Sequence, residues 1–255
     1  MRYVISDTHY ADPDSWWAGL DEFASKHGGE TVVAGDFAHW SFQPLASLQD
    51  ISPFERVVPG NHDAALIGCE LLNYHDEEVL ILDEGKQLVT HGHNADPVWN
   101  GEGGKWLNAK RRVGRFLLAI GYRWERPGRP DPDKLLRAVK WTHDKLIPRG
   151  WHVDKPHRYI DHAEALAREH GADIIIMGHT HRPGVWKRWL ADENRELYIV
   201  NVGAWVPLNQ SWRVHLGSQV GPLMRVEDVP CCVWDLEKRK LLRWDGYDLR
   251  EMEGR

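Results

Sequence analysis

The chain has 255 residues, of which 42% are hydrophobic and 27% charged, and its formal net charge is −6. This composition is ordinary for a soluble globular protein, and the acidic balance gives no general reason to expect nucleic-acid binding. No apolar run approaches the roughly 20 residues needed to cross a bilayer, so we expect no transmembrane segment, although peripheral contact with a membrane stays open.

The number of cysteines and the position of the first predicted strand indicate the cellular compartment. Three cysteines are present, and two of them, Cys231 and Cys232, are adjacent. An odd count with a neighbouring pair is a poor disulfide framework, which favours a reducing compartment. Because the first predicted strand begins at Arg2, we expect no signal peptide and predict a cytoplasmic protein. The oligomeric state does not follow from these features.

The first third of the chain alternates strand, loop and helix. Predicted strands cover residues 2–6, 31–34 and 56–58. Predicted helices follow them near residues 14–27, 43–50 and 62–72. Two further predicted strands, 79–82 and 86–91, form a hairpin around Asp83-Glu84-Gly85. This alternation predicts an α/β protein.

The segment at about 95–158 breaks this rhythm and shows helical rather than strand patterns. Between residues 104 and 129 it has eight basic residues, opposed only by Glu125. This excess indicates either a solvated helix face or a helical cap that recognises an anionic or amphiphilic substrate, with Arg111, Arg112 and Arg115 as candidate substrate-binding residues. The tryptophans between residues 99 and 141 either pack in a core or form a platform for an aromatic, sugar or acyl group.

The last third resumes with a predicted helix at 159–170, which Gly171 ends, and a strand at 173–177. Further strands are predicted at 185–189, 196–202, 231–236 and 240–245, and this strand-rich tail indicates an added antiparallel portion. We therefore predict a single domain over residues 1–255 that carries the cap as an insertion.

Five short segments contain residues of the kind that bind metal ions, and each follows an apolar, β-branched run. They are Asp7-Thr8-His9, Gly35-Asp36, Gly60-Asn61-His62-Asp63, Thr90-His91-Gly92-His93 and Gly178-His179-Thr180-His181. Ligands and catalytic groups collect at strand ends in α/β sheets. In an extended segment residues i and i+2 project to the same side, so Asp7 and His9 can both reach one ion, and His179 and His181 repeat this spacing at another strand end.

The residue types restrict the metal. Imidazole and carboxylate donors are wrong for calcium, which prefers oxygen ligands, and for a closed structural zinc site, which favours cysteine. They suit two divalent ions, with manganese favoured and iron, zinc, cobalt or nickel possible. The Asp36 carboxylate has two oxygens and can bridge both ions, whereas Asn61 supplies a neutral oxygen. Two such ions would clamp a phosphoryl group and acidify a water molecule, which predicts a metal-dependent hydrolase.

The order of these segments resembles that of the calcineurin-like metallophosphoesterases over roughly residues 3–205. The resemblance implies a four-layer αββα sandwich of two central mixed sheets flanked by helices. It implies hydrolysis of a phosphodiester or pyrophosphate by attack of a metal-bound hydroxide on phosphorus. In the implied ligand set Asp7, His9 and His181 hold the first ion, Asn61, His91 and His179 hold the second, and Asp36 bridges the two. His62 would stand near the phosphate and either protonate the leaving oxygen or stabilise the transition state, and Asp63 would orient His62.

A narrower similarity concerns the UDP-diacylglucosamine pyrophosphohydrolase branch, which carries a helical cap over a lipid-nucleotide site. The long insertion before His179 and the sequence Gly178-His179-Thr180-His181-Arg182-Pro183 resemble that branch. The chain departs from it at His62, where the branch has arginine, and at His93, where the branch has aspartate. These departures count against the lipid substrate of that branch and favour a related phosphodiesterase or phosphatase with a cap. The expected partner is a phosphorylated small-molecule or lipid-linked substrate. His93 either faces that substrate or forms hydrogen bonds beside the site.

Three alternative functions stay open. The chain could be a broad phosphomonoesterase, a nuclease whose basic cap grips a phosphate backbone, or a non-catalytic scaffold with the same fold. The acidic net charge counts against the nuclease. The presence of every expected ligand counts against the scaffold.

Overall fold

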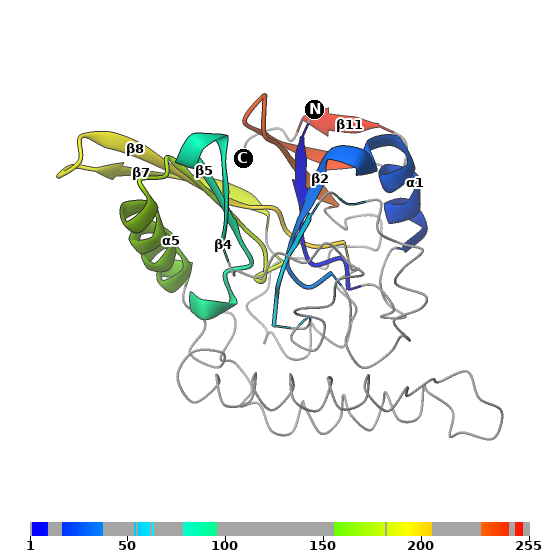
Figure 1. The fold of residues 1–255 in the computed structure, drawn as a ribbon, viewed down its shortest axis with the longest axis horizontal. Helices are drawn as coiled ribbons and strands as arrows, with labels where there is room; N and C mark the ends of the chain where they lie inside the picture. The colour runs from blue at the N-terminus through cyan, green and yellow to red at the C-terminus, as the bar shows by residue number, and fades with distance from the viewer. Residues whose placement is uncertain are drawn as a thin grey trace, which may run out of the picture.

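The computed structural model describes residues 2–9, 17–37, 54, 56–61, 63, 79–95, 156–181, 183–205, 231–244 and 248–251. Within them the chain forms two β-sheets, two α-helices and short 3₁₀ turns (Figure 1). The helices predicted near residues 43–50 and 62–72 lie outside the described residues. So does nearly all of the cap predicted at about 95–158.

The first sheet has six strands in the order β11-β10-β9-β1-β2-β3. Their bounds are β1 (Tyr3–Ile5), β2 (Thr31–Ala34), β3 (Arg56–Val58), β9 (Cys232–Asp235), β10 (Lys240–Trp244) and β11 (Leu249–Glu251). The three N-terminal strands run parallel, with Val4 opposite Val32 and Val33 opposite Val57. The strands from the C-terminal part continue the sheet antiparallel on the other side of β1. The expected antiparallel addition is therefore confirmed, and β11 is a strand that was not predicted.

The second sheet has five strands in the order β4-β5-β6-β8-β7. Their bounds are β4 (Val79–Leu82), β5 (Gln87–Thr90), β6 (Ile174–Met177), β7 (Gly184–Leu190) and β8 (Arg195–Asn201). Parallel β5, β6 and β8 form its centre. Antiparallel β4 and β7 form its edges. The hairpin predicted around Asp83-Glu84-Gly85 is confirmed as the connection between β4 and β5.

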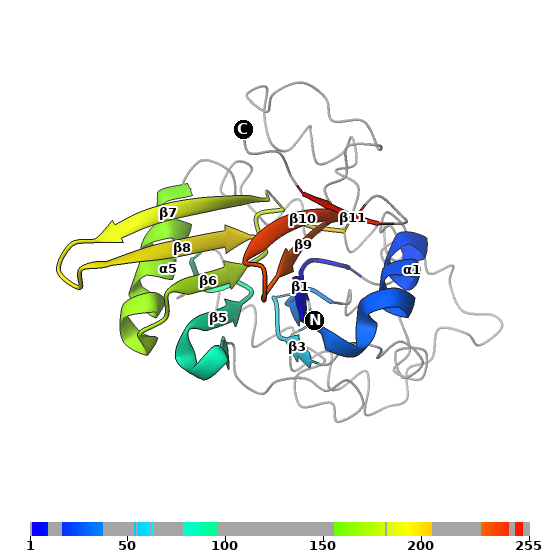
Figure 2. The ribbon, with the colours of Figure 1, turned by 90° about the horizontal axis from the view of Figure 1, so that it is seen from above.

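The two sheets pack face to face, and a helix covers the outer face of each. Helix α1 (Trp17–His27) lies on the first sheet, where its side chains Leu20 and Phe23 pack against Ile5 and Val33. Alternate residues of these strands face the other way, because successive side chains in a strand point to opposite faces. Figure 2 shows the two helices on opposite sides of the molecule.

The layer between the sheets and the layer under the second helix complete the core. Val4 and Trp234 of the first sheet meet Ile176 of the second in the central layer. Helix α5 (Pro156–His170) covers the outer face of the second sheet and places Ala163 against a cluster that contains Ile175. The predicted four-layer α/β sandwich is thus confirmed, and its middle strands are buried on both faces.

The carboxyl end of α5 is fixed to the second sheet. Gly171 ends the helix at φ 67°, and the Ala172 N–H donates to the Ala167 carbonyl at 3.0 Å. The Arg195 guanidinium donates to the carbonyls of Ala167 and Ala172. A cation is favourable at the carboxyl end of a helix. Near its other end the same helix places Tyr159 beside His179, and the centroids of these two rings are 6.0 Å apart.

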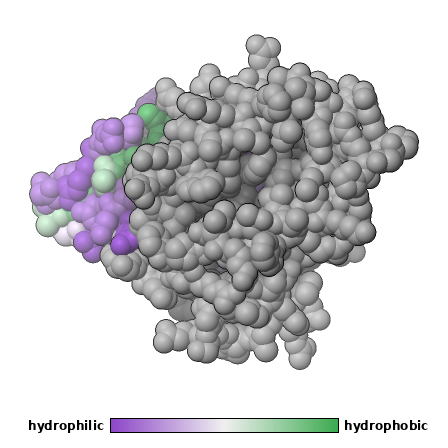
Figure 3. All heavy atoms as spheres, turned by 90° about the horizontal axis from the view of Figure 1, so that it is seen from below, coloured by the Kyte–Doolittle hydropathy of each residue, from purple (hydrophilic) through white to green (hydrophobic). Residues whose placement is uncertain are grey.

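The described surface has both polar and exposed apolar side chains. No described helix is both long and apolar enough to cross a membrane. Figure 3 shows one face of the molecule, on which the described atoms are mostly hydrophilic with a smaller apolar area. Large apolar side chains exposed within the described part are Ile81, Val185, Trp186 and Trp189. Three of them lie on the edge strand β7, where Lys187 and Arg188 disfavour pairing with a further strand.

Candidate metal centre

The loops that follow the parallel strands of both sheets meet at one place. Within the first sheet the Asp7 N–H donates to the Gly35 carbonyl at 3.0 Å, and within the second the Gly178 N–H donates to the His91 carbonyl at 3.2 Å. The Asp7 carboxylate connects the sheets, because its Oδ2 atom accepts the His179 N–H at 2.8 Å. The strand ends predicted to carry metal ligands are therefore neighbours in space.

Two groups of candidate ligands lie in this region. One contains Asp7, His9 and His181, and the other contains Asp36, His91 and His179. In each group the donor atoms all lie within 4.8 Å of one another. Four of the six residues are buried and two are half-buried. Two compact sets of nitrogen and oxygen donors fit a binuclear centre of divalent metal ions.

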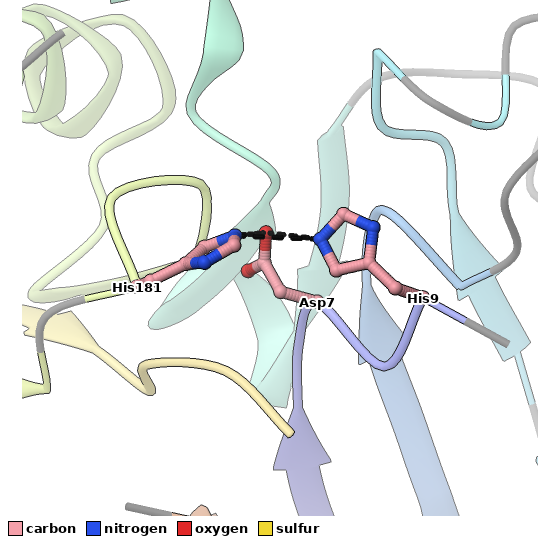
Figure 4. A group of neighbouring side chains, drawn as sticks. All are labelled: Asp7, His9 and His181. Atoms are coloured by element: carbon pink, nitrogen blue, oxygen red, sulfur yellow. Dashed lines mark hydrogen bonds and ion pairs between the residues drawn. The ribbon is translucent and has the colours of Figure 1, made fainter. Parts of the chain in front are cut away.

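In the first group two imidazoles face one carboxylate. The Asp7 Oδ1 atom lies 3.1 Å from His181 Nε2 and 3.9 Å from His9 Nε2, and the two Nε2 atoms are 3.3 Å apart. Figure 4 shows the two rings approaching the carboxylate from opposite sides. Ser6 Oγ donates to the other oxygen, Oδ2, which also accepts the backbone N–H of His179. Asp7 is therefore oriented so that Oδ1 faces the two imidazoles.

The second group is centred on His91, which is fully buried. Its Nδ1 atom lies 2.9 Å from the Ala34 carbonyl oxygen, so Nδ1 carries the proton and donates. Its Nε2 atom then faces Asn61 Oδ1 at 3.1 Å and Asp36 Oδ2 at 3.3 Å. A neutral imidazole would direct a lone pair at the carboxylate, an arrangement that calls for a cation between the two groups.

The protonation preferences of the buried groups give the same indication. Burial disfavours the charged form of His91, but the carboxylates of Asp36 and Asp7 outweigh burial and raise the pKa of the imidazole to about 10. Burial likewise disfavours the charged form of Asp7, but His91 and His181 outweigh it and lower the pKa of the carboxyl group. The residues therefore fit a resident cation, because the site concentrates negative charge where water is excluded.

The backbone at the candidate ligands is unusual. Five of them have a positive φ, with values from 44° to 66°, a region that residues other than glycine seldom adopt. They are Asp7, His9, Asp36, His179 and His181. Such conformations cost on the order of 1–3 kcal/mol each and persist where the surrounding structure holds them. Their concentration here indicates that orienting these side chains lowers the free energy of unfolding.

Three glycines allow the loops to approach closely. A Cβ atom at Gly35 would overlap the His91 ring, one at Gly60 would overlap Asp36 Oδ1, and one at Gly178 would overlap Ser6 Oγ and Asp7 Oδ2. The glycines of the sequence motifs are therefore explained by contacts with the candidate ligands.

The structure brings together all seven residues predicted as metal ligands. His93 is also buried here, and its ring centroid lies 5.4 Å from that of His91. His62 and the three arginines Arg111, Arg112 and Arg115 lie outside the described residues. Asp63 is fully buried, and its Oδ2 atom accepts the backbone N–H groups of Gly60 and Phe37.

Sequence reasoning missed three polar residues that support the ligand loops. Ser6 contacts Asp7, Thr8 donates to the Phe37 carbonyl at 2.7 Å, and Asn201 donates to the Gly178 carbonyl at 2.6 Å. Only Asn201 carried a sequence signal, because it lies near the end of the strand predicted at 196–202, just before Gly203. Partners across the fold decide the roles of the other two.

The sequence matches a known protein family. Residues 2–183 match the family model described as calcineurin-like phosphoesterase. No curated protein matches the chain significantly. Solved structures with a similar fold include a metallophosphoesterase from Sphaerobacter thermophilus, at 16% identity over 99% of this chain and 88% of that one, with a TM-score of 0.43.

Two further solved structures that match the chain carry different protein names. Vacuolar Protein Sorting 29 from Cryptosporidium parvum is 13% identical over 94% of this chain and 84% of its own, with a TM-score of 0.40. Phosphopantetheinyl hydrolase from Mycobacterium tuberculosis is 15% identical over 87% of this chain and 95% of its own, with a TM-score of 0.36. At these identities and TM-scores none of the matches bears on the activity of this chain.

Proposed function

The chain belongs to the calcineurin-like phosphoesterase family. We propose that it hydrolyses a phosphodiester or pyrophosphate bond in a small molecule with the help of two divalent metal ions. The observation that carries the proposal is the pair of buried donor groups at adjoining strand ends, each with two imidazoles and one carboxylate. This donor set matches metal-assisted hydrolysis and needs no serine or cysteine nucleophile.

The proposed ligand assignment follows the two donor groups. Asp7, His9 and His181 hold one ion, whereas His91 and His179 hold the other. Asn61 joins the second group, because its Oδ1 atom lies 3.1 Å from His91 Nε2.

Asp36 bridges the two ions in this proposal. It shares the second donor group with His91, and it also lies close enough to Asp7 for its charge to oppose ionisation of that carboxyl group. A carboxylate in this position has an oxygen available for each ion.

Bound at these groups, the ions would neutralise phosphate oxygens and lower the pKa of a water molecule. The side chains of the protein perform the remaining tasks. The Ala34 carbonyl orients the His91 imidazole, and buried strand ends exclude bulk water from the reacting atoms. His62 donates a proton to the departing oxygen in this proposal, which is supported by its place in the sequence between the buried residues Asn61 and Asp63.

The substrate class rests on the basic insertion. The excess of positive charge between residues 104 and 129 suits a phosphorylated small molecule or a lipid-linked phosphate, and Arg111, Arg112 and Arg115 are the residues we propose for its recognition. His93 lies close enough to the second group to contribute to the same recognition. Manganese as the resident metal and a cytoplasmic location remain predictions.

One experiment tests the proposed function directly. The purified protein is assayed for bound metals, and its hydrolysis of a generic phosphomonoester, a phosphodiester and a nucleotide pyrophosphate is compared in the presence of Mn²⁺. We expect two bound ions per chain and faster hydrolysis of the diester or pyrophosphate than of the monoester. Preference for the monoester would indicate a broad phosphatase, and steeply salt-dependent binding to single-stranded DNA would indicate a nuclease. Absence of metal and of activity would indicate a scaffold.

A further inference from the structure

The backbone of one residue, Phe37, lies between three of the ligand loops. The N–H of Phe37 donates to Asp63 Oδ2 at 3.1 Å, and the carbonyl of Phe37 accepts the Thr8 hydroxyl at 2.7 Å. Phe37 directly follows Asp36, and Thr8 lies between Asp7 and His9. The two backbone polar groups of Phe37 therefore join the first and second loops to the third.

Asp63 also forms hydrogen bonds with Gly60 in the third loop. Its Oδ2 atom also accepts the Gly60 N–H at 3.0 Å, and its own N–H donates to the Gly60 carbonyl at 3.3 Å. One carboxylate oxygen thus holds the residue after Asp36 and the residue before Asn61. Asp63 is fully buried, where hydrogen bonds from backbone N–H groups to an ionised acceptor are strong.

The connection has consequences for the spacing of candidate ligands. Gly60 lies so close to Asp36 that an added Cβ atom would overlap the Asp36 Oδ1 atom. The Asp36 backbone is itself held at φ 50°, and its carbonyl accepts the His9 N–H at 3.0 Å. A small shift of the third loop would therefore change the separation between Asp36 and Asn61, which are donors to the same ion in the proposed function.

We propose that Asp63 is a positioning residue for the second metal ion, acting through the backbone N–H groups of Gly60 and Phe37. This inference rests on the proposed function only in requiring that metal binds at the site. It assigns Asp63 a task distinct from orienting His62, because the described contacts of its Oδ2 atom reach the loops of two metal ligands. Thr8 supports the same arrangement from the first loop.

The chain contains a matched control for a carboxylate with a purely structural role. Asp235 is also fully buried, and its Oδ1 atom accepts the N–H groups of Glu237 and Lys238 at 3.1 and 2.9 Å. It is the last residue of β9, and its described contacts include none of the candidate ligands. Loss of either aspartate removes two similar hydrogen bonds, but only the loss of Asp63 disturbs the ligand loops.

The test compares Asp63→Ala with Asp235→Ala by titrating the metal-free proteins with Mn²⁺ and following the heat of binding. For Asp63→Ala we expect one of the two ions to bind roughly 10- to 100-fold more weakly, the usual effect of losing a residue that orients metal ligands. The other ion should bind as in the wild type. Asp235→Ala should bind both ions as the wild type does, even if its unfolding midpoint falls.

Two outcomes would overturn the inference. Wild-type affinity for both ions in Asp63→Ala would show that its carboxylate does not position the ligands, and equal losses in the two variants would show a general effect of destabilisation. If Asp63→Ala does not fold, Asp63→Asn and Thr8→Val replace it. The amide oxygen of the first can still accept both N–H groups, so it should bind the second ion better than Thr8→Val, and the reverse order would also overturn the proposal.

Failure of the proposed function would look different. A wild-type protein that binds two ions but hydrolyses none of the three phosphate substrates would contradict the proposed hydrolase. The positioning role of Asp63 would still be decided by the titrations, which do not depend on turnover.

Discussion

The Nε2 atom of His91 lies 3.3 Å from the Oδ2 atom of Asp36, and both side chains are buried. The other ring nitrogen of His91 is committed to the Ala34 carbonyl. A positive charge between the imidazole and the carboxylate must therefore come from a second imidazole proton or from a metal ion. The proton and the metal compete for the same lone pair.

This competition predicts that metal affinity rises with pH. Without metal the pKa of His91 is raised to about 10, so the imidazole holds its extra proton at neutral pH and must release it when metal binds. One displaced proton corresponds to about a tenfold change in apparent affinity per pH unit. Titration with Mn²⁺ between pH 6 and 8, in buffers of different ionisation enthalpy, would measure both the affinity and the released proton. A pH-independent affinity would contradict the assignment.

The stability of the metal-free protein should show the opposite dependence. A group whose pKa is raised on folding stabilises the folded state below its unfolded pKa, and this contribution is lost as pH rises through the folded pKa. For His91 the loss extends from about pH 6.5 to about pH 10. The lowered pKa of Asp7 acts only in acid, because its contribution is lost as pH falls below the range in which an unfolded carboxyl group ionises. Urea unfolding across both ranges, with and without metal, would separate the two effects.

Removal of a bridging ligand should abolish metal binding and turnover together. Asp36→Ala removes the carboxylate that we propose to contact both ions, so both metal content and hydrolysis should fall to background. Asp235→Ala is the matched control, since it removes a buried carboxylate elsewhere in the first sheet. Elemental analysis after dialysis provides the measurement. Full metal content in Asp36→Ala would contradict the bridging role.

Removal of the proposed acid should separate metal binding from turnover. His62→Ala should retain both ions yet slow hydrolysis by roughly two to four orders of magnitude, the usual contribution of a positioned proton donor. The loss should be largest for a substrate with a poor leaving group, because protonation of that oxygen matters most there. Equal losses on substrates with good and poor leaving groups would argue that His62 stabilises charge without donating a proton.

A methyl group at Gly178 should disrupt the site through packing alone. The Cβ atom of Gly178→Ala would overlap Ser6 Oγ and the Oδ2 atom of Asp7, so we expect a loss of about 1–3 kcal/mol in unfolding free energy and weaker metal binding. Gly29→Ala is the control, because nothing lies within 4 Å of its Cβ position. This control should change stability by less than about 0.5 kcal/mol in urea unfolding. Equal effects of the two substitutions would contradict the close approach.

Much of the fold could be predicted from the sequence because its central strands are short apolar runs followed by polar segments. Ile174–Met177 reads as a buried strand from its composition, and the pair His179 and His181 then follows at the strand end. The division of strands between the two sheets could not be predicted. Neighbouring strands such as β3 and β4 belong to different sheets, whereas β1 pairs with β9 from the far end of the chain.

The ligands of the candidate site were accessible to sequence reasoning, but their supports were not. His91 and Asp36 are recognisable because imidazoles and carboxylates at strand ends are typical of metal sites. Ser6 and Thr8 are small hydroxyl residues of a common kind, and their roles arise only where Ala34 and Phe37 come close to them in the folded chain. The family resemblance implies that Asp63 orients His62, which lies outside the described residues. The described hydrogen bonds of the Asp63 Oδ2 atom, to Gly60 and Phe37, could not be predicted from the sequence.

The pairing of β1 with β9 determines when the first sheet can be completed during synthesis of the chain. Tyr3 lies opposite Asp235 and Val4 opposite Trp234, so β1 obtains one of its two neighbours only after the chain up to Asp235 has been synthesised. Until then an apolar edge stays open to association with other nascent chains. Expression of a shortened version that stops before Cys231 should therefore give aggregated material, even though every proposed metal ligand would still be encoded.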